Sequence, residues 1–224
     1  MPRPAAFLFD MDGLLLDSER LMMRIFLEMT DELALDHGTS TEFFMGLIGT
    51  SSAETEQRVA DFLPRHVKFA DFMLSFRRRY ATRAEAGIPL RPFAKDVLSR
   101  LRELDARIAV VTSTKGVLAR QKLATAGLLP FLDHVRAGDE VRANKPDPAP
   151  YLQAAETLGV HPQDCVAFED SDPGITAAVA SGCHSFQIPD LRPSCSQLPD
   201  LGQEIATDLR DALRQLGLWN APLS

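Results

Sequence analysis

The segment AAFLFDMDGLLLDSE at residues 5–19 joins an apolar run of strand length to two carboxylates. Residues 5–9 lack polar alternation, so they predict a strand that is buried on both faces, as in a parallel sheet. The run stops at Asp10, and Asp12 and Gly13 follow directly after Met11. Charged groups are costly to bury, so we expect these two carboxylates to have a chemical role.

Three more apolar runs, at residues 107–111, 165–168 and 184–188, predict further buried strands, and residues 134–137 form a weaker fifth. Helical patterns lie between them, at 115–126, 148–158 and 172–182, the last with Asp172 as its expected N-cap. Two more helices are predicted from apolar faces, which comprise Phe93, Val97, Leu98, Leu101 and Leu104, and Ile205, Leu209, Leu213 and Leu216. Strands alternating with helices predict an α/β fold with a Rossmann-like parallel sheet.

Residues 18–87 interrupt this alternation, because they contain no convincing strand. Helical stretches are expected at 19–35, 51–63 and 68–86, with breaks at 37–39 and 64–66. We therefore predict a core domain of residues 1–17 and 88–224 and an inserted helical domain of residues 18–87. Hinges near residues 14–17 and 87–89 would let the insert close over a bound substrate.

In an open α/β sheet, the functional site lies beyond the carboxyl ends of the strands, so the residues that follow each strand belong together. These residues are Asp10, Asp12, Thr112, Ser113, Lys145, Glu169 and Asp170. Carboxylates that converge in one place repel one another unless a cation is present, and Mg²⁺ prefers oxygen ligands. A magnesium site beside a lysine suits a phosphorylated substrate, with one carboxylate as nucleophile and another as general acid and base.

The motifs FDMDG at 9–13, VVTS at 110–113, KPDP at 145–148 and EDS at 169–171 resemble, in order and spacing, the four motifs of the haloacid dehalogenase-like hydrolases. The helical insert resembles the α-helical cap of the phosphatase and β-phosphoglucomutase-like branch of that superfamily. The resemblance covers nearly the whole chain and implies a Mg²⁺-dependent phosphatase that acts on a small phosphorylated metabolite, such as a sugar phosphate.

The resemblance also implies a role for each motif residue. Asp10 is the expected nucleophile and a metal ligand. Asp12 is the expected general acid and base, and its backbone carbonyl is a further metal ligand. The expected substrate-binding residues are Gly13, Thr112, Ser113 and Lys145, of which Thr112 and Lys145 also take part in catalysis. Asp170 is expected to bind Mg²⁺ directly, and Glu169 to bind it directly or through a water molecule.

Two alternatives remain open within this resemblance. β-Phosphoglucomutases carry a histidine soon after the DxD loop, where this chain has Met22, and they carry cations in a cap loop. No cation lies between Thr39 and Gln57, where Ile48 and Ser52 align best, so a hydrolase is favoured. A non-catalytic binding module of the same fold would be expected to have lost the nucleophile or a metal ligand, yet Asp10 and Asp170 are both present.

Two groups in the insert have a structural and a functional interpretation, and the structural one is favoured for both. The arginines at 77–79 and 83 are expected on a solvated helix face rather than in a substrate site. An apolar group is expected to form the core of the insert rather than a substrate pocket, and it comprises Met22, Met23, Phe26, Phe43, Phe44 and Met45.

Composition narrows the class of protein further. The formal net charge of -7 and the pI near 5.2 argue against nucleic-acid and anionic-membrane partners. The three cysteines form no CxxC pair, which favours a reducing cytoplasmic setting. No apolar stretch is long enough to span a bilayer. We expect a monomer or a weak homo-oligomer.

Overall fold

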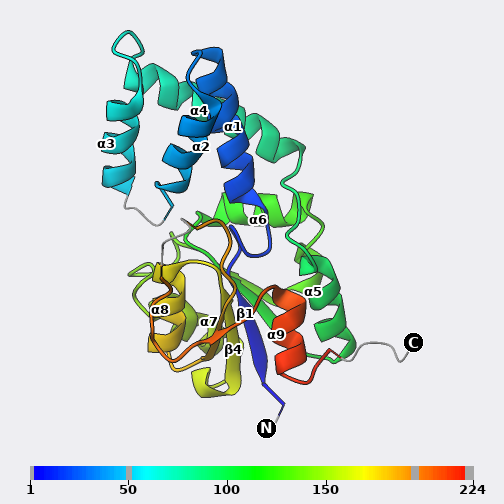
Figure 1. Cartoon of the computed structure of the whole chain (residues 1–224). Helices are drawn as coiled ribbons and strands as arrows, with labels where there is room; N and C mark the ends of the chain where they lie inside the picture. The colour runs from blue at the N-terminus through cyan, green and yellow to red at the C-terminus, as the bar shows by residue number, and fades with distance from the viewer. Residues whose placement is uncertain (1–2, 49–51, 193–196, 220–224) are drawn as a thin grey trace, which may run out of the picture. The chain divides into compact units, whose positions relative to one another are not determined.

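The computed structural model describes residues 3–48, 52–192 and 197–219. The chain divides into two compact units (Figure 1). The sheet unit comprises Met1–Asp17, Pro89–Asp190 and Leu198–Ser224, and the helical unit comprises Ser18–Ile88 and Leu191–Gln197. Of the described helices, none combines the length and the hydrophobicity that a membrane span requires.

The sheet unit is built on a parallel sheet with the strand order β3-β2-β1-β4-β5-β6. Its strands are β1 (Ala6–Phe9), β2 (Arg107–Val111), β3 (His134–Arg136), β4 (Cys165–Glu169), β5 (His184–Gln187) and β6 (Glu204–Ile205). The predicted α/β class with a Rossmann-like sheet is therefore confirmed. β1 lies inside the sheet, where it pairs with β2 on one side and β4 on the other, and all four of its residues are buried.

Helices cover both faces of this sheet. They are α5 (Ala94–Glu103), α6 (Gly116–Thr125), α7 (Ala149–Thr157), α8 (Asp172–Ala180) and α9 (Leu209–Gln215), with short 3₁₀ turns at Leu129–Phe131 and Pro162–Asp164. α7 and α8 pack together over the face that carries Leu8, Ala109 and Ala167. α5 and α9 pack against each other on the other side of β1 and β4 (Figure 1).

The register of the sheet aligns the carboxyl ends of its three middle strands. Phe9, the last residue of β1, pairs with Val110 on one side and with Phe168 on the other. The rings of Phe9 and Phe168 stack with their centroids 4.7 Å apart. Residues that directly follow Phe9, Val111 and Phe168 therefore meet at one edge of the sheet, where the strand order changes direction.

The helical unit contains α1 (Ser18–Glu32), α2 (His37–Met45), α3 (Ser52–Phe62) and α4 (Phe69–Ala86). Phe26 of α1 lies at its centre. Its ring contacts aromatic rings from the other three helices at centroid distances of 5.5–6.1 Å, and these belong to Phe43, Phe44, Phe62 and Phe72. The apolar faces of four amphipathic helices thus form the core of this unit.

Three local expectations from the sequence are wrong. Residues 37–39 begin helix α2 rather than break it, because Asp36 accepts a hydrogen bond from the Thr39 N–H and caps the helix. Ile205 belongs to strand β6, and the final helix begins only at Leu209. The N-cap of α8 is Ser171, so Asp172 is already inside the helix.

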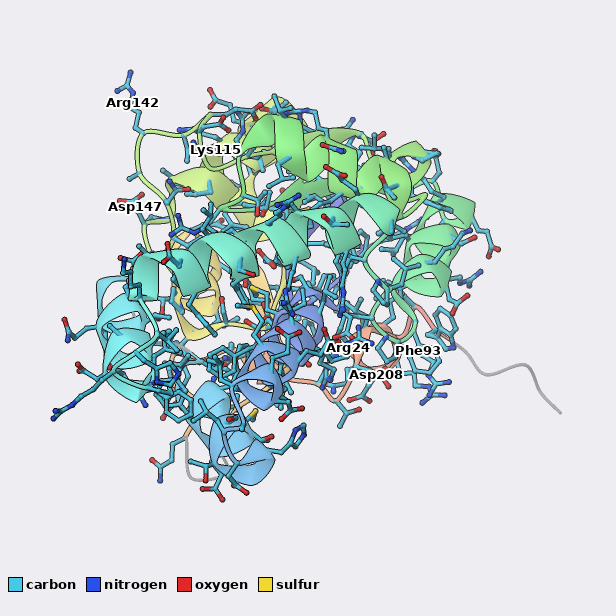
Figure 2. All side chains as sticks on the ribbon, turned by 90° about the horizontal axis from the view of Figure 1, so that it is seen from above. Arg24, Phe93, Lys115, Arg142, Asp147 and Asp208 are labelled. Carbon is cyan, nitrogen blue, oxygen red and sulfur yellow. The ribbon has the colours of Figure 1, made fainter. Side chains whose placement is uncertain are left out.

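Phe93 also lies outside the helix that was expected to contain it. It precedes α5 with a φ of 63°, and the guanidinium of Arg210 lies 3.7 Å from the centre of its ring. Figure 2 shows Phe93 near Asp208, which caps the N-terminus of α9. The same view places Lys115, Arg142 and Asp147, from the loops that follow β2 and β3, on the opposite side of the sheet unit.

Candidate active site

Asp10 and Lys145 form the centre of the site at the carboxyl edge of the sheet. Asp10 directly follows β1 and is buried, and its N–H donates to the carbonyl of Phe168. The Lys145 ammonium donates to Asp10 Oδ1 at 2.5 Å and to the Val111 carbonyl at 2.9 Å. Lys145 thereby connects the ends of β1 and β2, and its buried side chain is part of the site rather than of an exposed turn.

Glu169, the last residue of β4, is fully buried beside the same lysine. The Lys145 ammonium lies 2.6 Å from Glu169 Oε1, and the Tyr151 hydroxyl donates to that same oxygen. The other carboxylate oxygen, Oε2, accepts a 3.4 Å hydrogen bond from the Ser171 hydroxyl. Gly174 lies so close that a Cβ there would be 1.9 Å from Glu169 Oε2. The first turn of α8 therefore packs directly on this carboxylate.

Burial and neighbouring charges shift the ionisation of the central groups. Burial, with a smaller contribution from Glu169, raises the pKa of Asp10 to about 8, although the Lys145 ammonium acts to lower it. Burial alone would favour the neutral amine of Lys145, but the carboxylates of Asp10 and Glu169 raise its pKa above the usual value. Burial and the adjacent Glu169 likewise raise the pKa of the Tyr151 hydroxyl.

Asp170 completes a group of three buried carboxylates. Oxygen atoms of Asp10, Glu169 and Asp170 all lie within 4.8 Å of one another. The Lys145 ammonium pairs with Asp10 and Glu169, and Asp170 adds a third carboxylate, so these four groups carry an excess of negative charge that a divalent cation would neutralise. Oxygen donors at this spacing fit a hard cation such as Mg²⁺.

Gly13 brings the backbone of the loop after β1 close to Asp170. Its φ is +90°, and a Cβ there would lie 2.2 Å from Asp170 Oδ2. Glycine is required on both counts, because other residues disfavour this conformation and would clash. The N–H of Gly13 donates to the Leu16 carbonyl at 2.8 Å, so it is engaged within its own loop.

The Asp12 carboxylate lies outside the three-carboxylate cluster and is held by two donors. The Thr114 hydroxyl donates to Asp12 Oδ2 at 2.7 Å, and the Lys122 ammonium donates to Asp12 Oδ1 at 2.8 Å. The Asp12 side chain remains 28% exposed, whereas Lys122 is buried. The two neighbouring aspartates thus have different surroundings, as expected if they do different chemistry.

Thr112 and Ser113 follow β2 at the same edge of the sheet. Thr112 is buried, and its hydroxyl accepts a hydrogen bond from the Thr114 N–H at 3.1 Å. A Cβ on Gly138 would lie 2.2 Å from the Ser113 carbonyl oxygen, so the loops after β2 and β3 are in close contact. The loop that contains Thr112 and Ser113 therefore leads directly to Thr114, a partner of Asp12.

The helical unit contains a cavity of about 280 Å³ of its own. Its lining is mostly apolar and includes Met22, Phe26, Phe44, Leu47, Ile48 and Phe76, with Glu19 and Thr55 as polar members. Phe26 and Phe44 also belong to the aromatic core, so these two side chains both form the core of the unit and line the cavity. Ile48 lines the cavity and Ser52 begins α3, whereas residues 49–51 lie outside the described residues.

The arginines of α4 form ion pairs with other helices of the same unit. Arg79 and Arg83 make paired hydrogen bonds to Glu32 and Glu28 of α1, and Arg77 lies 3.4 Å from Glu56. The predicted solvated helix face is consistent with these exposed contacts.

Comparison with known proteins defines the family. The model of the haloacid dehalogenase-like hydrolase family matches residues 7–188, which includes all four motifs. The chain therefore belongs to this family and is a hydrolase. The match spans both the sheet residues and the helical insert.

Characterised relatives and solved structures support the assignment. Hexitol phosphatase A of Escherichia coli is 35% identical over 83% of this chain and 83% of its own length. Fructose-1-phosphate phosphatase of the same organism is 30% identical over 83% of this chain and 97% of its own length. A hydrolase of this family from Deinococcus radiodurans, solved with bound phosphate and sodium, superposes with a TM-score of 0.78 at 27% identity, and the match covers 98% of this chain and 99% of that one.

Three residues in these contacts were not singled out from the sequence, namely Tyr151, Thr114 and Lys122. Lys122 had a usable signal, because it lies between Ala119 and Leu123 on the buried face of α6. A lysine on an apolar helix face needs a partner for its charge. Tyr151 had no such signal, because a tyrosine beside Ala154 and Ala155 also fits an ordinary core.

Proposed function

We propose that this hydrolase is a Mg²⁺-dependent phosphatase that releases inorganic phosphate from a small phosphomonoester through an aspartyl-phosphate on Asp10. The observation that carries the proposal is the convergence of the Asp10, Glu169 and Asp170 carboxylates, of which Asp10 and Glu169 pair with the Lys145 ammonium. This arrangement provides a nucleophile, a fixed positive charge and oxygen donors in one buried place. The phosphatase names of the relatives agree with it.

The carboxylates of Asp10 and Asp170 and the backbone carbonyl of Asp12 would hold the cation, with Glu169 as a direct or water-mediated ligand. When bound, Mg²⁺ supplies positive charge that neutralises phosphate oxygens and the excess carboxylate charge. The cation would also favour the ionised form of Asp10, which burial alone disfavours.

The remaining steps are assigned to residues of the chain itself. Asp10 Oδ attacks phosphorus, a new O–P bond forms, and the ester O–P bond breaks. Asp12 in its protonated form gives a proton to the departing oxygen, and the resulting carboxylate later takes a proton from the water that cleaves the aspartyl-phosphate. Lys145 holds positive charge beside Asp10 throughout the transfer. Thr112 and the Ser113 backbone would bind the phosphate oxygens.

The substrate expected for this site is a sugar phosphate or a similar metabolite. The names of the two bacterial relatives support this class, and the acidic net charge of the chain is no obstacle because a bound cation and Lys145 together would supply positive charge at the site. Residues 18–87 would act as the cap that selects the substrate. We expect the apolar cavity at Met22 and Phe44 to disfavour highly charged groups there.

The test is phosphate release from a panel of sugar phosphates and p-nitrophenyl phosphate, with Mg²⁺ and with chelator. Asp10→Asn should abolish turnover, and Asp105→Asn is a matched control because Asp105 is exposed and has a φ of 55° that asparagine tolerates. A tenth of the wild-type rate in Asp10→Asn would contradict the assigned nucleophile. Conversion of β-glucose 1-phosphate to glucose 6-phosphate without phosphate release would favour a mutase.

The metal site has a separate test. Asp170→Ala should weaken Mg²⁺ binding in a calorimetric titration and should lower the rate at a fixed Mg²⁺ concentration. An unchanged binding isotherm would remove Asp170 from the ligand set.

A further inference from the structure

Lys122 is a buried lysine in the last turn of α6, and its ammonium pairs with a carboxylate of the site. It is 7% exposed and lies on the same helix face as Ala119 and Leu123, where an apolar residue would be expected. Burying an ammonium is unfavourable unless it is paired. Its side chain donates to Asp12 Oδ1 at 2.8 Å, across a sequence separation of 110 residues. An apolar residue would pack here without this cost, so the lysine calls for an explanation beyond packing.

Thr114 holds the other oxygen of the same carboxylate. Its hydroxyl donates to Asp12 Oδ2 at 2.7 Å, while its N–H donates to the Thr112 hydroxyl at 3.1 Å. Two donors from the loop after β2 and from α6 therefore fix both oxygens of Asp12. Two donors on opposite oxygens restrict the rotation of a carboxylate more than either donor alone.

We propose that Lys122, together with Thr114, is a positioning residue that sets the orientation of the Asp12 carboxylate for proton transfer. The proposal rests on the proposed function, because it assumes that Asp12 protonates the departing oxygen. In this scheme Lys122 contacts neither the phosphorus nor the departing oxygen, and it acts through the Asp12 carboxylate. Without the Lys122 ammonium, the Asp12 side chain populates other orientations. Its carboxyl group is then aligned for proton transfer to the departing oxygen in a smaller fraction of molecules.

The leaving group of the substrate separates this role from a structural one. A sugar alkoxide is a poor leaving group and needs a proton as the ester bond breaks, whereas p-nitrophenolate leaves well without one. The value of kcat/KM reports the steps up to the first phosphoryl transfer, so it depends on how much the leaving group needs a proton as the ester bond breaks. A loss of Asp12 alignment should therefore lower kcat/KM for the sugar phosphate more than for the aryl phosphate.

The experiment compares Lys122→Met, which keeps the apolar stem, with wild type on the best sugar phosphate of the panel and on p-nitrophenyl phosphate. General acid catalysis contributes about 10²–10⁴-fold, and we expect the sugar phosphate to lose at least about 10-fold more kcat/KM than the aryl phosphate. Arg120→Met is the control, because Arg120 lies on the same helix and pairs with Glu140 rather than Asp12. Equal losses on both esters, or no loss, would overturn the proposal.

Thr114→Val provides a second variant that leaves the buried lysine in place. It removes the donor to Asp12 Oδ2 and should show the same preference for the aryl ester, with a smaller amplitude. If Lys122→Met does not fold, this variant alone decides the question, and equal losses on both esters would refute the proposal. Wild type without activity on any ester would instead refute the proposed function, so the two failures are distinguishable.

Discussion

The hydrogen bond from Tyr151 to Glu169 offers a direct test of the buried network. Both residues are 0% exposed, and the Tyr151 hydroxyl donates to the oxygen that also lies 2.6 Å from the Lys145 ammonium. Tyr151→Phe keeps the ring that packs on the sheet and removes only this donor. Hydrogen bonds to charged groups contribute about 1.5–3 kcal/mol, so we expect the free energy of unfolding to fall by that amount.

A loss of this size is measurable in two ways. For a chain of this length, about 2–4 °C of Tm is lost per kcal/mol, which predicts a decrease of about 3–12 °C. Urea unfolding in chelator would give the free energy, with Glu169→Gln and the double variant completing a mutant cycle. A positive coupling between the two sites is expected, because they share one hydrogen bond. A Tyr151→Phe variant within ~0.5 kcal/mol of wild type would refute the reasoning.

Three further predictions concern the carboxylate cluster. Because the pKa of Asp10 is raised from 3.8 to about 8, chiefly by burial, the folded protein keeps a proton there that the unfolded chain loses. The contribution of Asp10 to the free energy of unfolding therefore falls as pH rises from about 4 to about 8. Asparagine does not titrate, so Asp10→Asn removes this pH dependence. In urea unfolding with chelator, the free energy of unfolding of the variant minus that of wild type should therefore be more positive at pH 8 than at pH 5. An equal difference at both pH values would contradict this. Gly174→Ala should displace Glu169, since the new Cβ would lie 1.9 Å from its Oε2, and calorimetry should then show weaker Mg²⁺ binding than in wild type. Gly13→Ala should lower the Tm, because it adds about 1–3 kcal/mol of backbone strain at a φ of +90° and a clash with Asp170. A Tm equal to that of wild type would argue against this strain.

The sheet and its functional edge were predictable because burial leaves a strong pattern. Strands β1, β2 and β4 lie within one residue of the expected runs, since strands buried on both faces read as continuous apolar segments. Their parallel register then brings together whatever follows them, and Asp10, Lys145, Glu169 and Asp170 do meet. The positions of Asp10, Glu169 and Asp170 follow from sequence order and sheet geometry, whereas Lys145 reaches them from the loop that follows β3.

The short and exposed elements were less predictable. Strand β6 has two residues, both exposed, and its parallel pairing with β5 depends on a partner that local sequence does not contain. Ile205 fits a helical spacing with Leu209 and Leu213, and the fold instead uses Asp208 to begin the helix later. A capping side chain within an apolar pattern outweighs the periodicity here, because it satisfies N–H groups that the pattern ignores.

The partners of Asp12 show a different limit of sequence reasoning. Asp12 was identified from a motif, but Lys122 lies 110 residues away and carries no motif of its own. A pattern of helical burial can reveal that a lysine is out of place, yet it cannot say which carboxylate the lysine meets. That partner is fixed by the order of the strands, because α6 directly follows β2, and β2 lies next to β1. The buried face of a helix that follows a neighbouring strand is therefore the first place to look for a charged residue that pairs with a carboxylate at the edge of the sheet.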